Sequence, residues 1–234
     1  MSILLLDTST DHAVLALCSA ADARSVQSSL VFEGRRTLSR KLLSRIDALL
    51  RSEGAGLKDL TGVAVGLGPG SFTGLRVGVT TAKTLAMALD IPLYGVETFH
   101  AYAAAGDDRG ATLVVSASRR NEVYAQFFHS GMPDGPAFTI SPDALAQRCA
   151  SLAAGDDLHV IGAGEAIAAL PGIKTRLGWP PAEGMASAAA ARIAAGPPDD
   201  HRVLVPVYVA QPIITTPKDA SVLSNAAARR SSQP

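Results

Sequence analysis

Short apolar runs followed by helical spacing organise the start of the chain. Ile3–Leu6 is a continuous apolar run of the kind that fills a strand buried on both faces. Ala13–Cys18 and the stretch around Leu30–Phe32 predict the next two strands. From Thr37 apolar residues recur at helical spacing, and Gly54 ends this helix. The apolar positions of the helix are Leu38, Leu42, Leu43, Ile46, Leu49 and Leu50.

The pattern then alternates between strands and helices. Val63–Val65 is an apolar run that predicts a buried strand, and Thr73–Leu89 predicts a second helix. Asp90–Val96 predicts another strand, and a short helix toward Ala105 follows. The first half of the chain therefore reads as β-β-β-α-β-α, which is typical of an α/β lobe.

A comparable pattern begins again after the polar, glycine-flanked segment Gly106–Gly110. Its predicted strands are Thr112–Val115, Glu122–Phe128, Leu158–Ile161 and Val203–Val209, and its predicted helices begin at Ser141 and Met185. We therefore expect an N-terminal lobe at residues 1–107, a C-terminal lobe at 108–215 and a flexible tail at 216–234.

Composition indicates a packed protein without a strong charge preference. Of 234 residues, 47% are apolar and 18% are charged, and 21 basic residues balance 21 acidic ones. Long-range attraction to nucleic acid or to an anionic membrane is therefore not built into the whole chain. Cys18 and Cys149 are too few for a disulfide framework. Asp7 interrupts the N-terminal apolar run, which argues against a signal peptide, so a cytoplasmic location is expected.

The segment Gly66–Gly78 combines a strand end, a glycine turn and a helix start. Free N–H groups and the helix dipole make such a junction a candidate anion site. Ser71 and Thr73 are candidate N-caps of the helix. The segment lacks the lysine of a phosphate-binding P-loop, and Thr73 stands where a dinucleotide fingerprint has its third glycine. Arg76 is the only basic residue nearby, so a structural turn and an anion site both remain open.

Four short motifs carry a resemblance to a known family. The run Gly68–Arg76, together with Asp7–Ser9, resembles the bacterial TsaB (YeaZ) family, and Glu122–Tyr124 and Pro206–Tyr208 fall where that family has similar triplets. The resemblance is dense over about residues 1–125. It implies a two-lobed α/β fold of the actin, Hsp70 and sugar-kinase (ASKHA) type with a degenerate second lobe. It also implies a role in making threonylcarbamoyladenosine in tRNA.

The resemblance implies where a nucleotide site would lie. Actin-like ATPases hold phosphate and metal at the end of the first strand. The matching residues of a vestigial site here are Asp7, Thr8, Ser9, Gly68 and Gly70. Those ATPases place a glycine in the following turn, which this chain fills with Thr8–Asp11. In the second lobe the matching segment is Ser116–Asn121, and Ala117 stands where many relatives have an aspartate. We therefore expect no ATPase activity from the chain by itself.

Metal ligands are also sparse. The five histidines are His12, His100, His129, His159 and His201. No two of them lie three to five positions apart, as a helical metal site would require. TsaD, the catalytic paralogue in this pathway, carries a His-x-x-x-His pair on the helix that matches Thr37–Arg51, where this chain has no histidine. The chain is therefore expected to be a subunit without catalytic residues.

A strip of small residues recurs every four positions along the second predicted helix: Gly74, Gly78, Ala82 and Ala86. Glycine inside a helix costs ~0.5–1 kcal/mol relative to alanine, so the strip indicates close approach of another element. That element is either the chain's own sheet or first helix, or a partner. Because the resemblance implies TsaB–TsaD pairing through the first two helices, we expect a partner interface. Its residues would be Phe72, Gly74, Leu75, Gly78, Ala82, Arg36 and Arg40.

The first predicted helix and the residues before it are rich in positive charge, from Arg35, Arg36, Arg40, Lys41, Arg45 and Arg51. A solvated face is the default interpretation of such a run. An acidic partner surface and tRNA phosphates are two functional alternatives. The balanced net charge and the adjacent predicted interface favour the partner.

The sequence thus predicts a non-catalytic subunit that binds and activates TsaD, together with TsaE. The chain itself would need no cofactor, the complex would use ATP, and tRNA would be bound only through the complex. A homodimer is expected when the partner is absent. The alternative is an ATP-dependent phosphotransferase or a metallopeptidase-like enzyme of the same fold. A general nucleic-acid-binding module is disfavoured, because only 5% of residues are aromatic.

Overall fold

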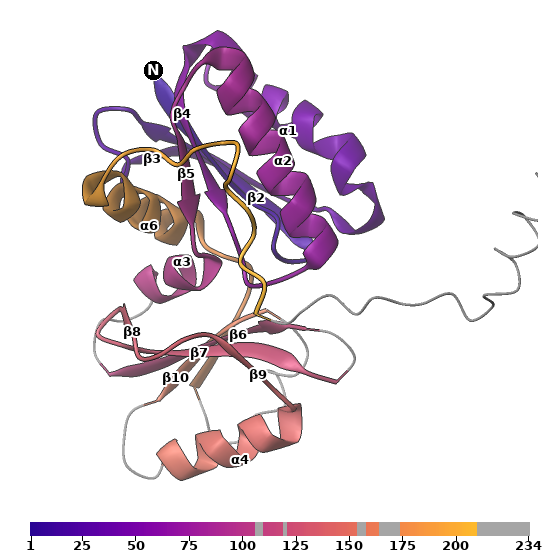
Figure 1. Ribbon diagram of the computed structural model, residues 1–234, viewed down its shortest axis with the longest axis vertical. Coiled ribbons are helices and arrows are strands. Elements are labelled where there is room, and N and C mark those ends of the chain that lie inside the picture. Colours follow the sequence, from indigo (N-terminus) through magenta and orange to yellow (C-terminus); the bar gives the residue numbers. More distant parts are fainter. Residues whose placement is uncertain (106–109, 119–120, 154–157, 164–173, 210–234) are drawn as a thin grey trace, which may run out of the picture.

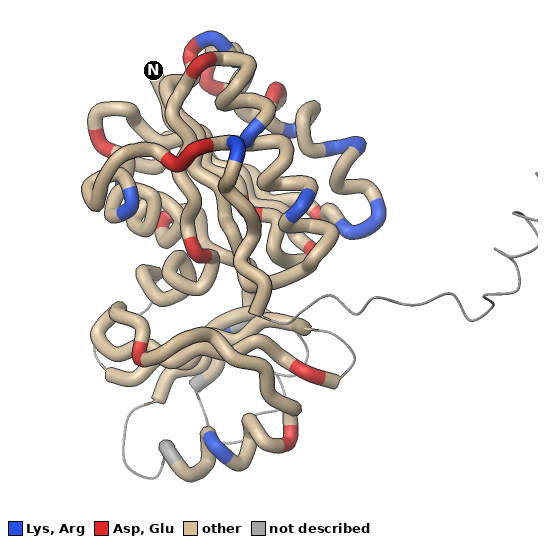
Figure 2. Tube along the Cα trace, viewed as in Figure 1, with Lys and Arg blue, Asp and Glu red and all other residues tan. Residues whose placement is uncertain are grey.

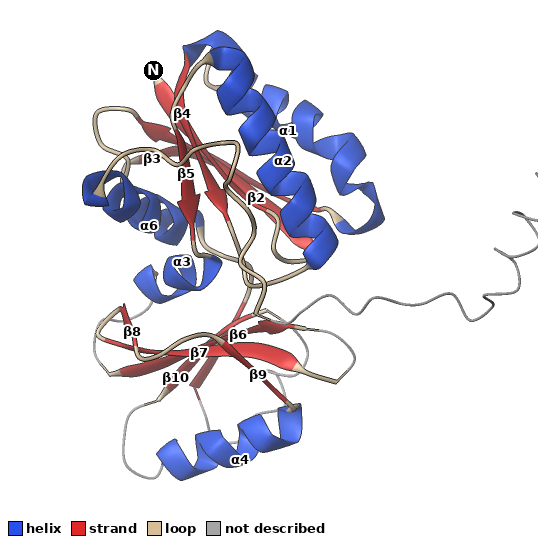
Figure 3. Cartoon of the chain, viewed as in Figure 1, coloured by secondary structure: helices blue, strands red, loops and turns tan. Residues whose placement is uncertain are grey.

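Two β-sheets, one per lobe, build the molecule in the computed structural model (Figure 1). The structure describes residues 1–105, 110–118, 121–153, 158–163 and 174–209. Figure 3 shows helices on both faces of the first sheet and a further helix, α4, at the far side of the second. The predicted tail at 216–234 lies outside the described residues. Within the described part, no helix is both long and apolar enough to span a membrane.

The first lobe follows the predicted order of elements. In chain order these are β1 (Ser2–Asp7), β2 (His12–Ser19), β3 (Val26–Glu33), η1 (Arg35–Thr37), α1 (Leu38–Ser52), η2 (Leu57–Asp59), β4 (Leu60–Gly66), α2 (Phe72–Leu89), β5 (Leu93–Val96) and α3 (Thr98–Ala104). The sheet order is β3-β2-β1-β4-β5, with β1, β4 and β5 parallel and β1, β2 and β3 antiparallel. The strand expected from Asp90 starts later, because Asp90 ends α2 in the left-handed conformation with φ of 53°.

The second lobe repeats this arrangement. Its described elements are β6 (Ala111–Ala117), β7 (Val123–His129), β8 (Met132–Pro133), β9 (Phe138–Ile140), α4 (Pro142–Ala153), β10 (His159–Gly162), β11 (Lys174–Leu177) and α6 (Ala182–Ala195). The order of the second sheet is β11-β10-β6-β7-β8. Read from β8 to β11, it matches the first sheet strand by strand, so that β6 corresponds to β1 and β10, which is parallel to both β6 and β11, corresponds to β4. The expected duplication is therefore confirmed. Ser141 caps α4 through its hydroxyl, as predicted.

The first sheet is covered on both faces, which explains why β1 is apolar throughout. Leu4 and Leu6 point to the face covered by α1 and α2, and they share a core with Leu42, Ile46 and other residues of those helices. The opposite face belongs to a second core that includes residues of α3 and α6. Successive residues of a strand point to opposite faces, so one short run supplies both cores.

Helix α3 lies between the two sheets (Figure 1). Ala101 packs with the first sheet, whereas Phe99 and Tyr102 pack with residues of β6, β7 and β10. The hydroxyl of Tyr102 donates a hydrogen bond to the carbonyl oxygen of Gly178, just after β11, at 3.0 Å. This one short helix therefore joins the two lobes.

Helix α6 differs from its expected place. Residues 182–195 fall in the range expected for the C-terminal lobe, yet α6 packs on the first sheet and on α3. The contact with α3 is closest at Gly184, where an added Cβ would overlap with the carbonyl oxygen of Ala101. The small side chains of α6 permit this approach, and they carry no signal of which sheet they will meet.

The segment expected as a last strand, Val203–Val209, is not a strand of either described sheet. It runs back along the first lobe after α6 (Figure 1). The N–H of Val207 donates to the carbonyl oxygen of Leu67 at 2.8 Å, and Lys83 donates to that of Leu204 at 3.0 Å. These hydrogen bonds attach the segment to the turn before α2 and to α2 itself without a strand ladder, and its valines at 203, 205 and 207 stay exposed.

We predict that Gly184→Ala destabilises the protein by about 1–3 kcal/mol, because a Cβ at this position overpacks the contact between α6 and α3. The loss should appear although alanine favours a helix by up to ~1 kcal/mol over glycine. Denaturant unfolding measures it. Glu183→Gln changes an exposed neighbour on the same helix and serves as the control. Equal stability of Gly184→Ala and the wild type would contradict the close packing.

Candidate functional site

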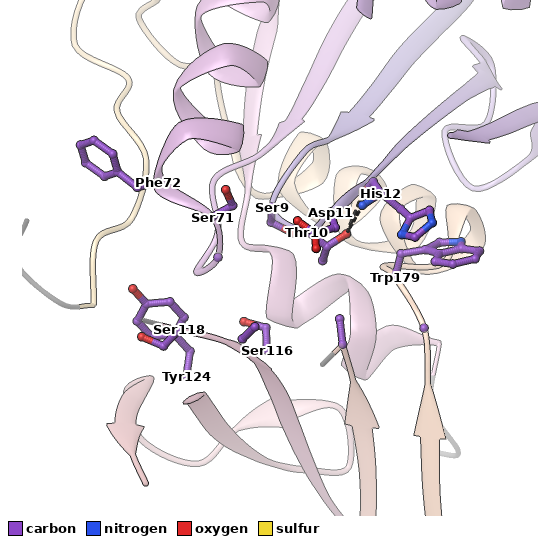
Figure 4. Close-up of a pocket in the computed structure, with 14 residues that line it drawn as sticks. Ser9, Thr10, Asp11, His12, Ser71, Phe72, Ser116, Ser118, Tyr124 and Trp179 are labelled. Atoms are coloured by element: carbon purple, nitrogen blue, oxygen red, sulfur yellow. Dashed lines mark hydrogen bonds between the residues drawn. The ribbon is translucent and has the colours of Figure 1, made fainter. Parts of the chain in front are cut away.

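A pocket of about 520 Å³ opens between the lobes, where the carboxyl ends of β1, β6, β10 and β11 meet (Figure 4). Ligands of open α/β sheets bind at such strand ends. The lining residues are Ser9, Thr10, Asp11, His12, Gly70, Ser71, Phe72, Ser116, Ala117, Ser118, Tyr124, Ala163, Gly178 and Trp179. Of the expected vestigial nucleotide site, Ser9 and Gly70 lie here, and so does the second-lobe segment at Ser116–Ser118.

Asp7 lies behind the pocket and is fully buried. Its Oδ1 accepts hydrogen bonds from the N–H and the hydroxyl of Ser9 at 2.8 and 2.6 Å, and its Oδ2 accepts one from Thr98 at 2.6 Å. Burial raises the pKa of Asp7 above its ordinary value of 3.8, although these hydrogen bonds act in the opposite direction. The carboxyl group therefore serves as an internal hydrogen-bond acceptor and does not line the pocket.

Thr8 is also buried, beneath the start of α2. Its hydroxyl donates to the carbonyl oxygen of Gly74 at 2.8 Å. A Cβ at Gly74 would overlap with the carbonyl oxygen of Thr8, and a Cβ at Gly78 would overlap with its hydroxyl. The glycines of α2 therefore exist because this helix crosses the end of β1 at very short range.

This packing corrects the expected partner interface. Gly74, Gly78 and Ala82 are buried, and Leu75 fills the first lobe's interior beside Gly68. The small-residue strip contacts the chain's own sheet. The interpretation of Gly74, Leu75, Gly78 and Ala82 as a partner surface is therefore wrong. Sequence spacing places small residues on one side of a helix but leaves open what that side meets.

The glycine turn before α2 uses its polar groups internally. The N–H of Ser71 donates to the carbonyl oxygen of Ser9 at 2.7 Å, and the N–H of Gly68 donates to Thr98 at 3.1 Å. Ser71 also caps α2, since its hydroxyl accepts the N–H of Gly74 at 3.2 Å. These donors are therefore occupied, and the geometry favours the structural turn over the anion site.

The charges around the pocket do not suit phosphate. Among the described lining residues, the only carboxylate side chain is that of Asp11, and none is a lysine or arginine. Asp11 faces Arg35, with Oδ2 and Nε 3.2 Å apart. The described residues also contain no group of three or more histidine, cysteine, aspartate or glutamate side chains placed to hold a metal ion. Among the described residues of the pocket, we find none of the lysine, arginine or clustered metal-binding side chains that phosphoryl transfer requires.

Two features of the pocket escaped sequence reasoning. His12 at the start of β2 stacks on Trp179 after β11, with ring centroids 4.6 Å apart, so this pair joins the lobes at one end of the pocket. Tyr124 of β7 lines another part. The match of β6 to β1 pointed to Ser116. No sequence motif marks Trp179, because the ring on which it stacks, His12, belongs to the other lobe.

The remaining expected interface residues lie elsewhere. Phe72 packs on Tyr208 at a centroid distance of 5.2 Å, and the guanidinium of Arg76 lies over the Phe72 ring at 5.1 Å. Arg36 and Arg40 are exposed before and on α1. A role of Phe72, Arg36 and Arg40 in partner binding stays a prediction.

Comparisons with known proteins agree with this architecture. The family model for tRNA N6-adenosine threonylcarbamoyltransferase, TsaD, matches residues 33–132. The tRNA threonylcarbamoyladenosine biosynthesis protein TsaB of Haemophilus influenzae is 37% identical over 127 residues, 53% of this chain and 52% of that protein. Its Escherichia coli namesake is 36% identical over 128 residues, 53% of each. The solved structure of YeaZ from Pseudomonas aeruginosa is similar with a TM-score of 0.68 at 25% identity, covering 88% of this chain and 99% of that one.

The repeated sheets with a pocket between them define a two-lobed α/β protein of the actin, Hsp70 and sugar-kinase class. Within that class, the sequence of the chain is similar to that of TsaB (YeaZ) proteins. The chain spans about half the length of the two curated TsaB proteins that it matches.

We predict that the contribution of Asp7 to the free energy of unfolding falls as the pH rises, and that Asp7→Asn removes this pH dependence. Because the folded-state pKa of Asp7 lies above 3.8, folding favours the protonated form, and its contribution to stability is lost as the pH rises through the folded pKa. Urea unfolding at a series of pH values measures this. The stability difference between wild type and Asp7→Asn should shrink as the pH rises from 3.8. A difference that grows instead would mean that the three donors hold Asp7 ionised.

We also predict that Gly78→Ala lowers the free energy of unfolding by about 1–3 kcal/mol, because its Cβ would overlap with the hydroxyl of Thr8. Denaturant unfolding compares it with Thr80→Ala at an exposed position on the same helix, which should stay within about 0.5 kcal/mol of the wild type. If both variants matched the wild type, the strip would not pack on Thr8.

Proposed function

We propose that the chain is a non-catalytic subunit of the machinery that makes threonylcarbamoyladenosine in tRNA. It binds and activates a TsaD subunit, together with TsaE. The complex uses ATP and holds tRNA, whereas the chain itself requires no cofactor. In the absence of TsaD it forms a homodimer, and it acts in the cytoplasm. The similarity to two tRNA threonylcarbamoyladenosine biosynthesis proteins supports the pathway. The TsaD family match over 33–132 supports pairing between subunits of similar fold.

The observation that carries the non-catalytic role is the orientation of Asp7. Its carboxyl group is enclosed by Ser9 and Thr98, where it cannot reach a metal ion or phosphate in the pocket. Among the described lining residues, no basic side chain takes the place of the missing phosphate contacts. A phosphotransferase of the same fold is thereby disfavoured.

The outer sides of α1 and α2 are the surface proposed for TsaD. These helices lie side by side on one face of the first sheet (Figure 1), and Figure 2 shows basic residues along and before α1. Leu43 on α1 is 58% exposed, although its spacing predicted a core position, and Met87 on α2 is 62% exposed. Leu43 lies three positions after Arg40 on the same helix, and an exposed apolar side chain beside a charged one suits an interface with an apolar centre and a charged rim.

We predict that Leu43→Glu weakens co-purification with the TsaD protein of the same organism at least tenfold, because it places a charge in the apolar part of the interface. Its thermal midpoint should stay close to that of the wild type, since Leu43 is exposed. Met132→Glu makes the same change at a residue that is 70% exposed in the second lobe, and it should leave co-purification unchanged. Equal binding of TsaD by all three proteins would contradict this surface.

A reconstituted modification assay tests the proposed role itself. Product formation on tRNA should need this chain in addition to TsaD, TsaE and ATP, and Leu43→Glu should lower it in parallel with co-purification. Full product without the chain would refute the proposal, and so would ATP turnover by the isolated chain at a rate sufficient for the reaction.

A further inference from the structure

The hydroxyl groups on the first-lobe side of the pocket already have partners. Ser9 donates to Asp7 at 2.6 Å, and Thr10 donates to the carbonyl oxygen of His12 at 2.7 Å. The hydroxyl of Ser71 accepts a backbone N–H of α2. This side of the pocket is therefore internally satisfied and offers a ligand little free hydrogen-bonding capacity.

The second-lobe side is different. The hydroxyls of Ser116 and Ser118 are buried and have no hydrogen-bond partner among the described residues. Ser116 is 3% exposed, and Figure 4 shows its hydroxyl in the middle of the pocket, opposite Ser9 and Ser71. A buried polar group without a partner costs about 1–3 kcal/mol, so two of them on one wall indicate a molecule that hydrogen-bonds there.

Aromatic rings lie on either side of these hydroxyls. Trp179 stands at one end of the pocket with one face on His12, and it stays 40% exposed. Tyr124 stands at the other end beside Ser118 (Figure 4). Flat ligands stack on such rings, and base stacking on an aromatic side chain contributes about 1–3 kcal/mol. The volume of about 520 Å³ lies within the usual range of small-molecule pockets.

The charges of the described lining residues favour an uncharged ligand. Asp11 is the only carboxylate among the described lining residues, and its ion pair with Arg35 already compensates it. No described lysine or arginine in the lining would replace the water that a phosphate group loses on entry. An uncharged ligand avoids this cost.

We propose that this pocket binds an uncharged ligand with one flat ring and several hydroxyl groups, which is the chemistry of a nucleoside. Its hydroxyls bond to Ser116 and Ser118, and its ring packs on Trp179. Because the two walls belong to different lobes, the bound ligand also holds the lobes in the arrangement of Figure 1.

The chain has one tryptophan, so its emission comes from Trp179, which lines this pocket and a neighbouring one beside Tyr102 and Arg176. Adenosine, guanosine, cytidine and uridine are titrated separately, with ribose and ATP as further arms. At least one nucleoside should give a saturable change at a concentration at least tenfold below that needed with ribose or ATP. The proposal is overturned if no nucleoside saturates, if ATP binds as tightly, or if ribose does.

One serine variant in the pocket and one control variant outside it test the site, with nucleoside binding measured by calorimetry. Ser116→Ala should weaken nucleoside binding about three- to tenfold, the effect of one lost neutral hydrogen bond. Its thermal midpoint should stay equal or rise, since the lost hydroxyl has no partner in the free protein. Ser28→Ala removes another buried hydroxyl without a partner, on β3 outside the pocket, and should bind like the wild type. Equal affinity of Ser116→Ala and the wild type overturns the assignment.

Discussion

The buried carboxyl group of Asp7 is the constraint on which the region between the lobes depends. Ser9 donates to it twice and Thr98 once, and Thr98 in turn accepts the N–H of Gly68. One side chain thus joins the end of β1, the glycine turn before α2 and the first residue of α3. Since α3 lies between the two sheets, the same hydrogen bonds set how the second lobe meets the first. Desolvation of such a group is tolerated only because each donor is in place.

The same constraint decides which groups between the lobes face solvent. A carboxylate that accepts three hydrogen bonds inside the protein is not available to a metal ion. Thr8 is covered by α2, whose Gly74 and Gly78 allow the close crossing. What remains open to solvent is a pocket of hydroxyl and aromatic groups between the lobes. Binding, either of a small ligand or of a protein partner through the outer helices, is the kind of activity that this arrangement supports.

Local sequence patterns predicted where the strands and helices lie far better than they predicted which other elements those strands and helices contact. The strand and helix order of the first lobe follows from period and length, and Ser71 and Ser141 cap α2 and α4 as expected. Leu43 shows the limit, because it fits the helical spacing but lies outside the arc that faces the sheet. Val203–Val209 shows a second limit of sequence patterns. Alternating apolar residues predicted a strand there, but they also occur in an extended segment that lies beside a helix without joining a sheet.

The amino-acid sequence by itself determined the α/β class and the repeated lobes, because these follow from periodicity and from residue types. The tertiary structure alone decided that the small residues of α2 face β1, that α6 covers the first sheet and that His12 meets Trp179. Each of these contacts joins segments far apart in the chain. A local pattern records which side of an element is small or apolar, whereas only packing selects what that side meets.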